Sequence, residues 1–322
     1  MQHLIRRHRL LFNFNHNSKN EIPVFFSTDD NYIPYLDVAI ASLIDNASKE
    51  YEYRIVILNT GILPENIEKV KKNERPGFSI DFVDISVPLE NIKKYFKNVY
   101  HFSIVTYYRL FIASLFPEYE KKVYIDCDLV VLGDISELYR TELGDNIIAA
   151  VPDQNIKNVP AFRRYIENPI SVDSDKYINA GVLVINLEAF RSYEIEQQLI
   201  HLITTYNFDL VDPDQAYINY LCRDKIHYLP NGWNKIPAPY PCEGKKNIVH
   251  YALYKKPWQY DDVEDGEYFW QYAEKSPFCD LIKERRAAFG DEEKKAKEAA
   301  SIDIVLHADK IASSEYTFAK KL

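Results

Sequence analysis

An alternation of short apolar runs with helical patterns constrains the fold of this 322-residue chain more than any other feature. Strands are expected at Pro23–Ser27, Tyr53–Leu58, Ser79–Val83, Lys122–Asp126, Ala180–Leu187 and Asn247–Tyr251. Helices are expected at Tyr32–Asn46, from Pro64 onward, at Ile104–Phe116, after Leu187 as far as Tyr206 and at Pro213–Leu221. Strands separated by helices predict a parallel, doubly wound sheet of the α/β class. In such sheets, ligands bind beyond the carboxyl ends of the strands.

Composition divides the chain into three parts. Residues 1–20 contain basic side chains and no acidic one, which predicts a basic arm or an extra helix, or a weak membrane-surface contact. Residues 21–258 carry the alternation and form the main domain. Residues 259–322 are rich in Lys, Glu and Ala with few turn signals, so we expect a helical extension packed partly against that domain.

The totals exclude several classes of protein. Hydrophobic content of 47% and charged content of 27% are typical of a soluble globular protein, and a net charge of −9 argues against nucleic acid as a partner. No apolar run approaches the length of a membrane span. The 4 cysteines show no paired spacing, which suggests neither a zinc site nor a disulfide framework. We therefore expect a cytoplasmic protein with at most peripheral contact at the inner face of a membrane.

A run of strand-forming residues, Val123 to Leu132, contains two carboxylates, Asp126 and Asp128. Alternate residues of a strand point to one side, so both carboxylates can converge on one spot. Two hard oxygen ligands at this spacing suit Mg²⁺ or Mn²⁺ carrying a phosphate-bearing substrate. The alternative is an exposed strand end whose acids cap the following turn.

Further polar segments follow expected strands or begin expected helices. Asp29 and Asn31 come after the first strand, where they can hold a ribose or base or cap the next helix. His101 precedes a helix that carries Arg109, a residue suited to clamp a phosphate or sugar or to form a surface salt bridge.

Three more segments lie toward the C-terminus. Asn179-Ala-Gly places an amide and a glycine at a strand start, where the glycine admits either a ligand or a neighbouring strand. Asp212-Pro-Asp-Gln215 lies at a helix start, where Asp212 can serve a site or act as an N-cap. His250 to Trp258 offers a third metal ligand and lysines that can neutralise phosphate.

Together and in this order, these segments resemble glycosyltransferase family 8, the retaining sugar-nucleotide-dependent transferases that include bacterial lipopolysaccharide galactosyl- and glucosyltransferases and glycogenin. The similarity runs from about Ile22 to Trp258. The best matches are Phe26–Tyr32, Thr106–Leu110, Val123–Asp128, Asn179–Leu187, Asp214-Gln215 and His250–Trp258. The resemblance implies a GT-A fold for residues 21–258, with a Rossmann-like, mostly parallel sheet flanked by helices. It also implies a UDP-sugar bound with a divalent metal, usually Mn²⁺, with Mg²⁺ as the alternative.

The resemblance also implies roles for individual residues. The metal ligands would be Asp126, Asp128 and His250. The substrate-binding residues would be Asp29 and Asn31 at uracil and ribose, Arg109 and Asn179 at the sugar, and Lys256 at the diphosphate. His101 is a further substrate-binding candidate from its position before the helix that carries Arg109. The catalytic candidates are Gln215, Asp214 and Asp153. An amide is a feeble nucleophile, so we favour front-face transfer in which Gln215 and Asp214 orient the donor.

The resulting hypothesis is a hexosyltransferase that moves glucose or galactose from its UDP-sugar to a glycan or lipopolysaccharide-type acceptor. A non-catalytic sugar-nucleotide-binding protein and a glycogenin-like self-glucosylating enzyme remain as alternatives, the latter because the chain has 25 tyrosines. A haloacid dehalogenase phosphatase also uses Asp-x-Asp, but usually on its first strand, and several strands come first here. One departure from the family is Leu253, which stands where a glycine is common.

Overall fold

A computed structural model describes residues 20–96, 104–238, 240–252 and 254–322. The expectations for the basic arm, for His101 and for Leu253 fall on residues 1–19, 101 and 253, which lie outside the described residues.

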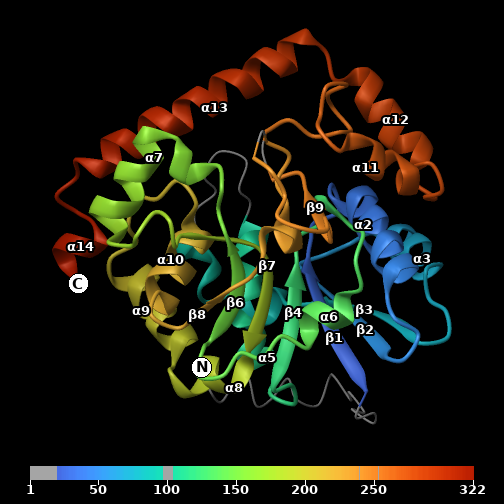
Figure 1. The fold of residues 1–322 in the computed structure, drawn as a ribbon, viewed down its shortest axis with the longest axis horizontal. Coiled ribbons are helices and arrows are strands. Elements are labelled where there is room, and N and C mark those ends of the chain that lie inside the picture. Colours follow the sequence, from blue (N-terminus) through green and yellow to red (C-terminus); the bar gives the residue numbers. More distant parts are fainter. Residues whose placement is uncertain (1–19, 97–103, 239, 253) are drawn as a thin grey trace.

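A seven-stranded sheet with the order β3-β2-β1-β4-β7-β6-β8 forms the centre of the molecule (Figure 1). Its strands are β1 (Glu21–Ser27), β2 (Glu52–Asn59), β3 (Phe78–Asp84), β4 (Lys121–Ile125), β6 (Ile148–Pro152), β7 (Ile178–Asn186) and β8 (Ile226–Tyr228). All neighbouring pairs are parallel except those of β7, which runs antiparallel to β4 and β6. The α/β class with a mostly parallel sheet is confirmed, and β7 is the strand that runs antiparallel to its neighbours.

The direction of β7 decides where its first residues lie. Val182 pairs with Ile125, and the backbone N–H of Asp126 donates to the carbonyl of Gly181 at 2.8 Å. Because β7 is antiparallel, its start lies at the same edge as the carboxyl ends of the other strands. The amide and glycine that begin β7 therefore lie beside the carboxylates that follow β4.

A second, two-stranded sheet brings distant segments together. β5 (Leu129–Val131) pairs antiparallel with β9 (Ile248–His250), and Leu129 is the partner of His250. The apolar residues after Asp128 form β5, which is fully buried. This pairing places His250 next to Asp128 although more than a hundred residues separate them in the chain. Sequence patterns did not predict β5, β6 or β8 as strands.

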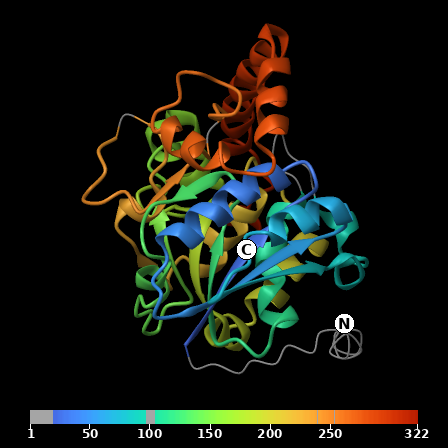
Figure 2. The same ribbon diagram turned by 90° about the vertical axis from the view of Figure 1, so that its right-hand side faces the viewer.

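Helices cover both faces of the central sheet (Figures 1 and 2). Those of the main domain are α2 (Ile33–Asn46), α3 (Pro64–Lys71), α4 (Ser86–Leu89), α5 (Ile112–Leu115), α6 (Ile135–Tyr139), α7 (Pro160–Tyr165), α8 (Leu187–Ser192), α9 (Ile195–Thr205) and α10 (Pro213–Cys222). Alternate residues of β1 enter different cores: Phe25 packs with α5, α8 and α10, while Val24 and Phe26 pack with α2. This alternation shows that both faces of the sheet are buried.

The segment expected as one helix, Ile104–Phe116, is instead a 3₁₀ helix over Ile104–Phe111 followed by α5. β-Branched and aromatic residues dominate its first half, and these lose side-chain freedom in an α-helix. The tighter winding still directs Arg109 inward, where its side chain is 3% exposed.

The C-terminal part is helical, as expected, and consists of α11 (Gly266–Ala273), α12 (Cys279–Ala288), α13 (Asp291–Ala312) and α14 (Phe318–Lys321). Phe269 and Ile282 are buried in the core that contains α2, while Ile311 and Phe318 are buried in the other core. Figure 2 shows the long red helix α13 rising at one end of the molecule and the start of β1 at the other. Among the described residues, no helix combines the length and apolar character that a membrane crossing needs.

Candidate active site

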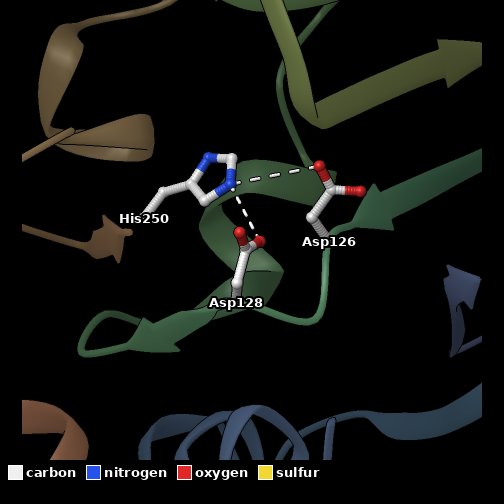
Figure 3. Close-up of side chains that lie close together, drawn as sticks. All are labelled: Asp126, Asp128 and His250. Carbon is white, nitrogen blue, oxygen red and sulfur yellow. Dashed lines mark hydrogen bonds and ion pairs between the residues drawn. The ribbon is translucent and has the colours of Figure 1, made fainter. Parts of the chain in front are cut away.

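Asp126, Asp128 and His250 form a compact cluster where β4, β5 and β9 meet (Figure 3). One ligand atom from each side chain lies within 4.8 Å of the others. The Nε2 atom of His250 is 3.1 Å from Oδ1 of Asp128 and 4.0 Å from Oδ2 of Asp126. Two carboxylates and an imidazole converging in this way form a donor set that can hold a divalent cation.

Gly181 makes room for this cluster. A Cβ atom at this position would lie 2.2 Å from Cε1 of His250 and 2.8 Å from Oδ2 of Asp126. The glycine therefore admits the two ligand side chains themselves, rather than simply a neighbouring strand. This cradle is the clearest sign that the three residues are arranged as a unit.

Asn234, which the sequence reasoning missed, orients the histidine. Its Oδ1 atom is 2.9 Å from Nδ1 of His250, and its Nδ2 donates to Oδ1 of Asn179 at 2.9 Å. Because an amide oxygen only accepts, Nδ1 of His250 donates its proton to Asn234, and this bond turns Nε2 toward the carboxylates. The local sequence Asn231-Gly-Trp-Asn234 contains no recognisable signal of this role.

The two carboxylates have opposite electrostatic surroundings. Burial raises the pKa of Asp128, but Nζ of Lys256 at 2.7 Å, together with His250, outweighs burial and holds the pKa below its usual range. Burial raises the pKa of Asp126 above its usual range, Arg109 opposes this rise, and the nearby charge of Asp128 adds to it. A divalent cation would favour the ionised form of both carboxylates.

Arg109 joins this cluster to the next carboxylate along the cavity. Its Nη2 lies 2.9 Å from Oδ1 of Asp126 and its Nε lies 3.3 Å from Oδ2 of Asp214. It also donates to the carbonyls of Thr106 and Ala180. The alternative of a surface salt bridge is therefore wrong, because this guanidinium is buried and held on several sides.

The side chain of Gln215 is held at both ends of its amide. Its Oε1 accepts from the backbone N–H of Ala180 at 3.0 Å, and its Nε2 donates to Oδ2 of Asp212 at 3.0 Å. Nearby, Nδ2 of Asn179 donates to Oδ2 of Asp153 at 3.1 Å. The amides therefore point in defined directions before any substrate binds.

Asp212 lies at the start of α10, but it does not act as the expected N-cap, since no capping hydrogen bond is made by its side chain. It accepts instead from the hydroxyls of Tyr165 and Tyr177, each at 2.7 Å. Burial raises the pKa of Asp212 to about 7, against the opposing effect of these two bonds. No local pattern in the sequence connects these tyrosines to Asp212.

A cavity of about 660 Å³ lies against these side chains. Most of the site residues predicted from the sequence line it, namely Asp29, Arg109, Asp126, Asp128, Asp153, Asn179, Asp214, Gln215, His250 and Lys256. Asn31 is exposed and is not among the lining residues. Asp29 lines the cavity, and its Oδ1 accepts from the backbone N–H of Tyr32 at 3.1 Å, in the turn that precedes α2.

Comparisons with known proteins agree on one family. The model of glycosyl transferase family 8 matches residues 23–262. General stress protein A of Bacillus subtilis (strain 168) is 29% identical over 262 residues, which are 74% of this chain and 88% of the relative. A putative glycosyltransferase of Haemophilus influenzae is 29% identical over 228 residues, covering 70% of this chain and 67% of the relative.

Two solved structures are similar in fold. The galactosyltransferase LgtC, solved in complex with donor and acceptor sugar analogs, gives a TM-score of 0.69 at 27% identity, covering 80% of this chain and 96% of LgtC. The apo structure of the bifunctional glycosyltransferase WbbM gives 0.73 at 25% identity, covering 85% of this chain and 53% of WbbM. These matches confirm the expected GT-A-like fold.

Proposed function

Since this chain belongs to glycosyl transferase family 8, we propose that it is a metal-dependent, retaining hexosyltransferase that moves glucose or galactose from a UDP-sugar to a carbohydrate acceptor. The observation that carries this proposal is the cluster of Asp126, Asp128 and His250 on the wall of a cavity that also contains Asp214 and Gln215. The acceptor would be a glycan of the cell-surface or lipopolysaccharide type, and the site of action the cytoplasm.

The donor set supports Mn²⁺ as the bound cation. Mg²⁺ favours oxygen ligands alone, whereas His250 supplies a nitrogen beside the two carboxylates. Gly181 leaves room for the ligands to converge, and Asn234 presents Nε2 of His250 in the form that binds a metal. When bound, such a cation would neutralise the negative charge that develops on the departing diphosphate.

The residues of the chain supply the rest of the donor site. Nζ of Lys256 lies 2.7 Å from Oδ2 of Asp128, so its ammonium group is next to the place where the metal-bound diphosphate would lie. Asp29, which lines the cavity, would contact uracil and ribose. Asn179, with its oxygen and nitrogen already directed by neighbours, would bind sugar hydroxyls. Preorganised donors and charges of this kind usually contribute most to catalysis.

The hydrogen bonds of the Gln215 side chain favour front-face transfer of the sugar. In this reaction the bond between the anomeric carbon and the phosphate oxygen breaks while the acceptor hydroxyl attacks from the same face, and the departing phosphate takes the proton. A double displacement would need a free nucleophile, but the Gln215 amide is engaged at both ends. Asp214 is paired with Arg109, and Asp153 accepts from two backbone N–H groups. A covalent sugar trapped on Asp153 or Asp214 and detected by mass spectrometry would contradict front-face transfer.

The direct test is a panel of UDP-sugars scored for Mn²⁺-dependent release of UDP. We expect release from UDP-glucose or UDP-galactose, and a fall of at least about 100-fold in Asp128→Ala, because the variant loses a metal ligand. The matched control is Asp224→Ala, since the side chain of Asp224 is 90% exposed. Full activity in Asp128→Ala would contradict the metal assignment.

Intact-mass measurement in the same reactions separates transfer to another molecule from self-glucosylation. Unchanged mass with release of UDP supports a separate acceptor. Added hexoses would support modification of one of the 25 tyrosines instead. Binding of UDP with no release from any sugar would indicate a non-catalytic binding protein.

A further inference from the structure

One wall of the cavity comes from α13, which lies beyond the residues that the family model matches. Lys297, Ala300, Ser301 and Ile304 all line the cavity. Residues three, four and seven positions apart share one face of an α-helix, so a single face of α13 is directed at the site. Figure 1 shows this helix along the top of the molecule, beside α7.

Lys297 is the charged residue of this face. It is half-buried, its Nζ donates to Oε1 of Gln259 at 2.8 Å, and it lies 5.8 Å from the ring centroid of Phe289. The backbone N–H of Gln259 in turn donates to the carbonyl of Lys256 at 2.9 Å. Lys297 is thereby held against the same turn that carries Lys256.

The two lysines differ in how their charges are balanced. Lys256 is paired with Asp128 at 2.7 Å. For Lys297, none of the carboxylates in the described part of the chain lies within ion-pair distance, and its recorded partners are a neutral amide and an aromatic ring. Burial, together with the charge of Lys256, lowers the pKa of Lys297 to about 8. An anion bound between the two lysines would remove this repulsion.

We propose that Lys297 is a second diphosphate-binding lysine of the donor site, supplied by α13. The inference rests on the proposed function, since the diphosphate is that of the UDP-sugar. The position of Lys297 favours a diphosphate as the bound anion. Lys297 is hydrogen-bonded to Gln259, which is in the same turn as Lys256, and Lys256 contacts the metal ligand Asp128. The phosphates of a metal-bound nucleotide must lie next to that ligand, whereas the acceptor must approach the sugar.

The test is calorimetric titration of UDP, with Mn²⁺ present, into the full chain and three variants. In Lys297→Gln we expect the affinity for UDP to fall about tenfold, as for loss of a charge-assisted hydrogen bond, and the KM for the UDP-sugar to rise while kcat changes little. Lys297→Arg keeps the charge and should stay within about threefold of the wild type. The matched control is Lys295→Gln, an exposed lysine on the same helix, which should bind UDP as the wild type does.

Uridine, which has no phosphate, serves as the second ligand. An unchanged affinity for uridine in Lys297→Gln supports a phosphate contact, and an equal loss for uridine and UDP would contradict it. Wild-type affinity for UDP in Lys297→Gln overturns the inference, and so does a rise in the acceptor KM alone, which would assign the lysine to an anionic acceptor. If the wild type does not bind UDP in the presence of Mn²⁺, the proposed function is wrong. If the wild type binds UDP and Lys297→Gln binds it equally well, only the role of Lys297 is wrong.

Discussion

The base and the roof of the cavity are built by different physical means. The base, where β4, β5, β7 and β9 meet, holds its functional side chains through direct contacts among buried groups, such as those of His250 with Asp128 and Asn234. The roof is one face of α13, and its lining residues Ala300 and Ser301 are exposed or half-buried. The base is therefore a buried, closely packed region, whereas the roof is partly exposed to solvent.

This difference predicts different sensitivities to mutation. In a close-packed region a single added methyl group displaces its neighbours. On a partly exposed helix face the same change meets solvent and flexible side chains. We therefore expect the base to determine whether the site binds a metal at all, and the roof to adjust how tightly the substrate is bound.

The largest effect is expected for Gly181→Ala. The added Cβ would lie 2.2 Å from Cε1 of His250 and 2.8 Å from Oδ2 of Asp126, so these two ligand side chains must be displaced. A misplacement of about 1 Å can cost about 100-fold in rate, and we expect UDP release to fall by at least this factor. Titration of Mn²⁺ would show the accompanying loss of metal affinity.

Gly266→Ala is the matched control, because a Cβ there would meet Pro257 and Val263 at the ordinary distances of 3.5 Å and 3.6 Å. Near-normal activity is expected for this variant. If Gly181→Ala were as active as Gly266→Ala, the base would tolerate an added methyl group, and the expected contrast with the partly exposed roof would be lost.

An intermediate effect, on stability rather than activity, is expected where the C-terminal helices join the main domain. Asp37 on α2 is buried and accepts from Oγ of Ser276 at 2.6 Å and from Nδ2 of Asn73 at 2.7 Å. Burial raises the pKa of Asp37 from 3.8 to about 6 despite these bonds. The folded state therefore binds the proton of the Asp37 carboxyl group more tightly than the unfolded state does.

The stabilisation from protonated Asp37 is complete below about pH 4 and is lost as the pH rises through about 6. Its full size is on the order of 2–3 kcal/mol. Urea unfolding of the wild type and of Asp37→Asn, compared from pH 4 to pH 8, should show the variant gaining stability relative to the wild type as the pH rises. A difference that does not vary with pH would show that Asp37 does not titrate in this range.

The smallest effect is expected at the surface anchor of the roof. Nε of Arg164 on α7 lies 2.9 Å from Oδ1 of Asp309 on α13, and both side chains are 52% exposed. Exposed ion pairs contribute about 0–1 kcal/mol, so Asp309→Asn should lower the free energy of unfolding by less than about 1 kcal/mol and leave UDP release unchanged.

A buried residue of the same helix provides the contrast. Ile311 is 3% exposed, and Ile311→Ala should cost roughly 2–4 kcal/mol in the same unfolding measurement. Equal costs for the two variants would mean that the roof is anchored by charge rather than by its buried apolar residues.

Much of the site could be predicted because its chemistry is local in the sequence. Asp126 and Asp128 directly follow an apolar strand, so their position at the ligand-binding edge of the sheet could be predicted from the strand pattern. His250 ends another apolar run, and Gln215 lies near a proline-marked helix start. Such residues can be found from their immediate neighbours, without knowledge of the fold.

Residues that act through distant partners could not be predicted in this way. Asn234 orients His250 from another loop, and Tyr165 and Tyr177 turn Asp212 away from the capping role that its position favoured. Lys297 lies in a segment whose Lys, Glu and Ala residues are those of any exposed helix. These partners become apparent only once the separate segments are packed together.

The amino-acid sequence by itself determined the α/β class, the strand that Asp126 and Asp128 follow, and membership of the family, because periodicity and short motifs depend on neighbouring residues. The tertiary structure decided that β7 runs antiparallel, which brings Gly181 under the imidazole of His250, and that α13 closes the cavity with Lys297. Strand direction and helix docking depend on long-range burial of apolar surface, and local sequence does not encode which distant surfaces will meet.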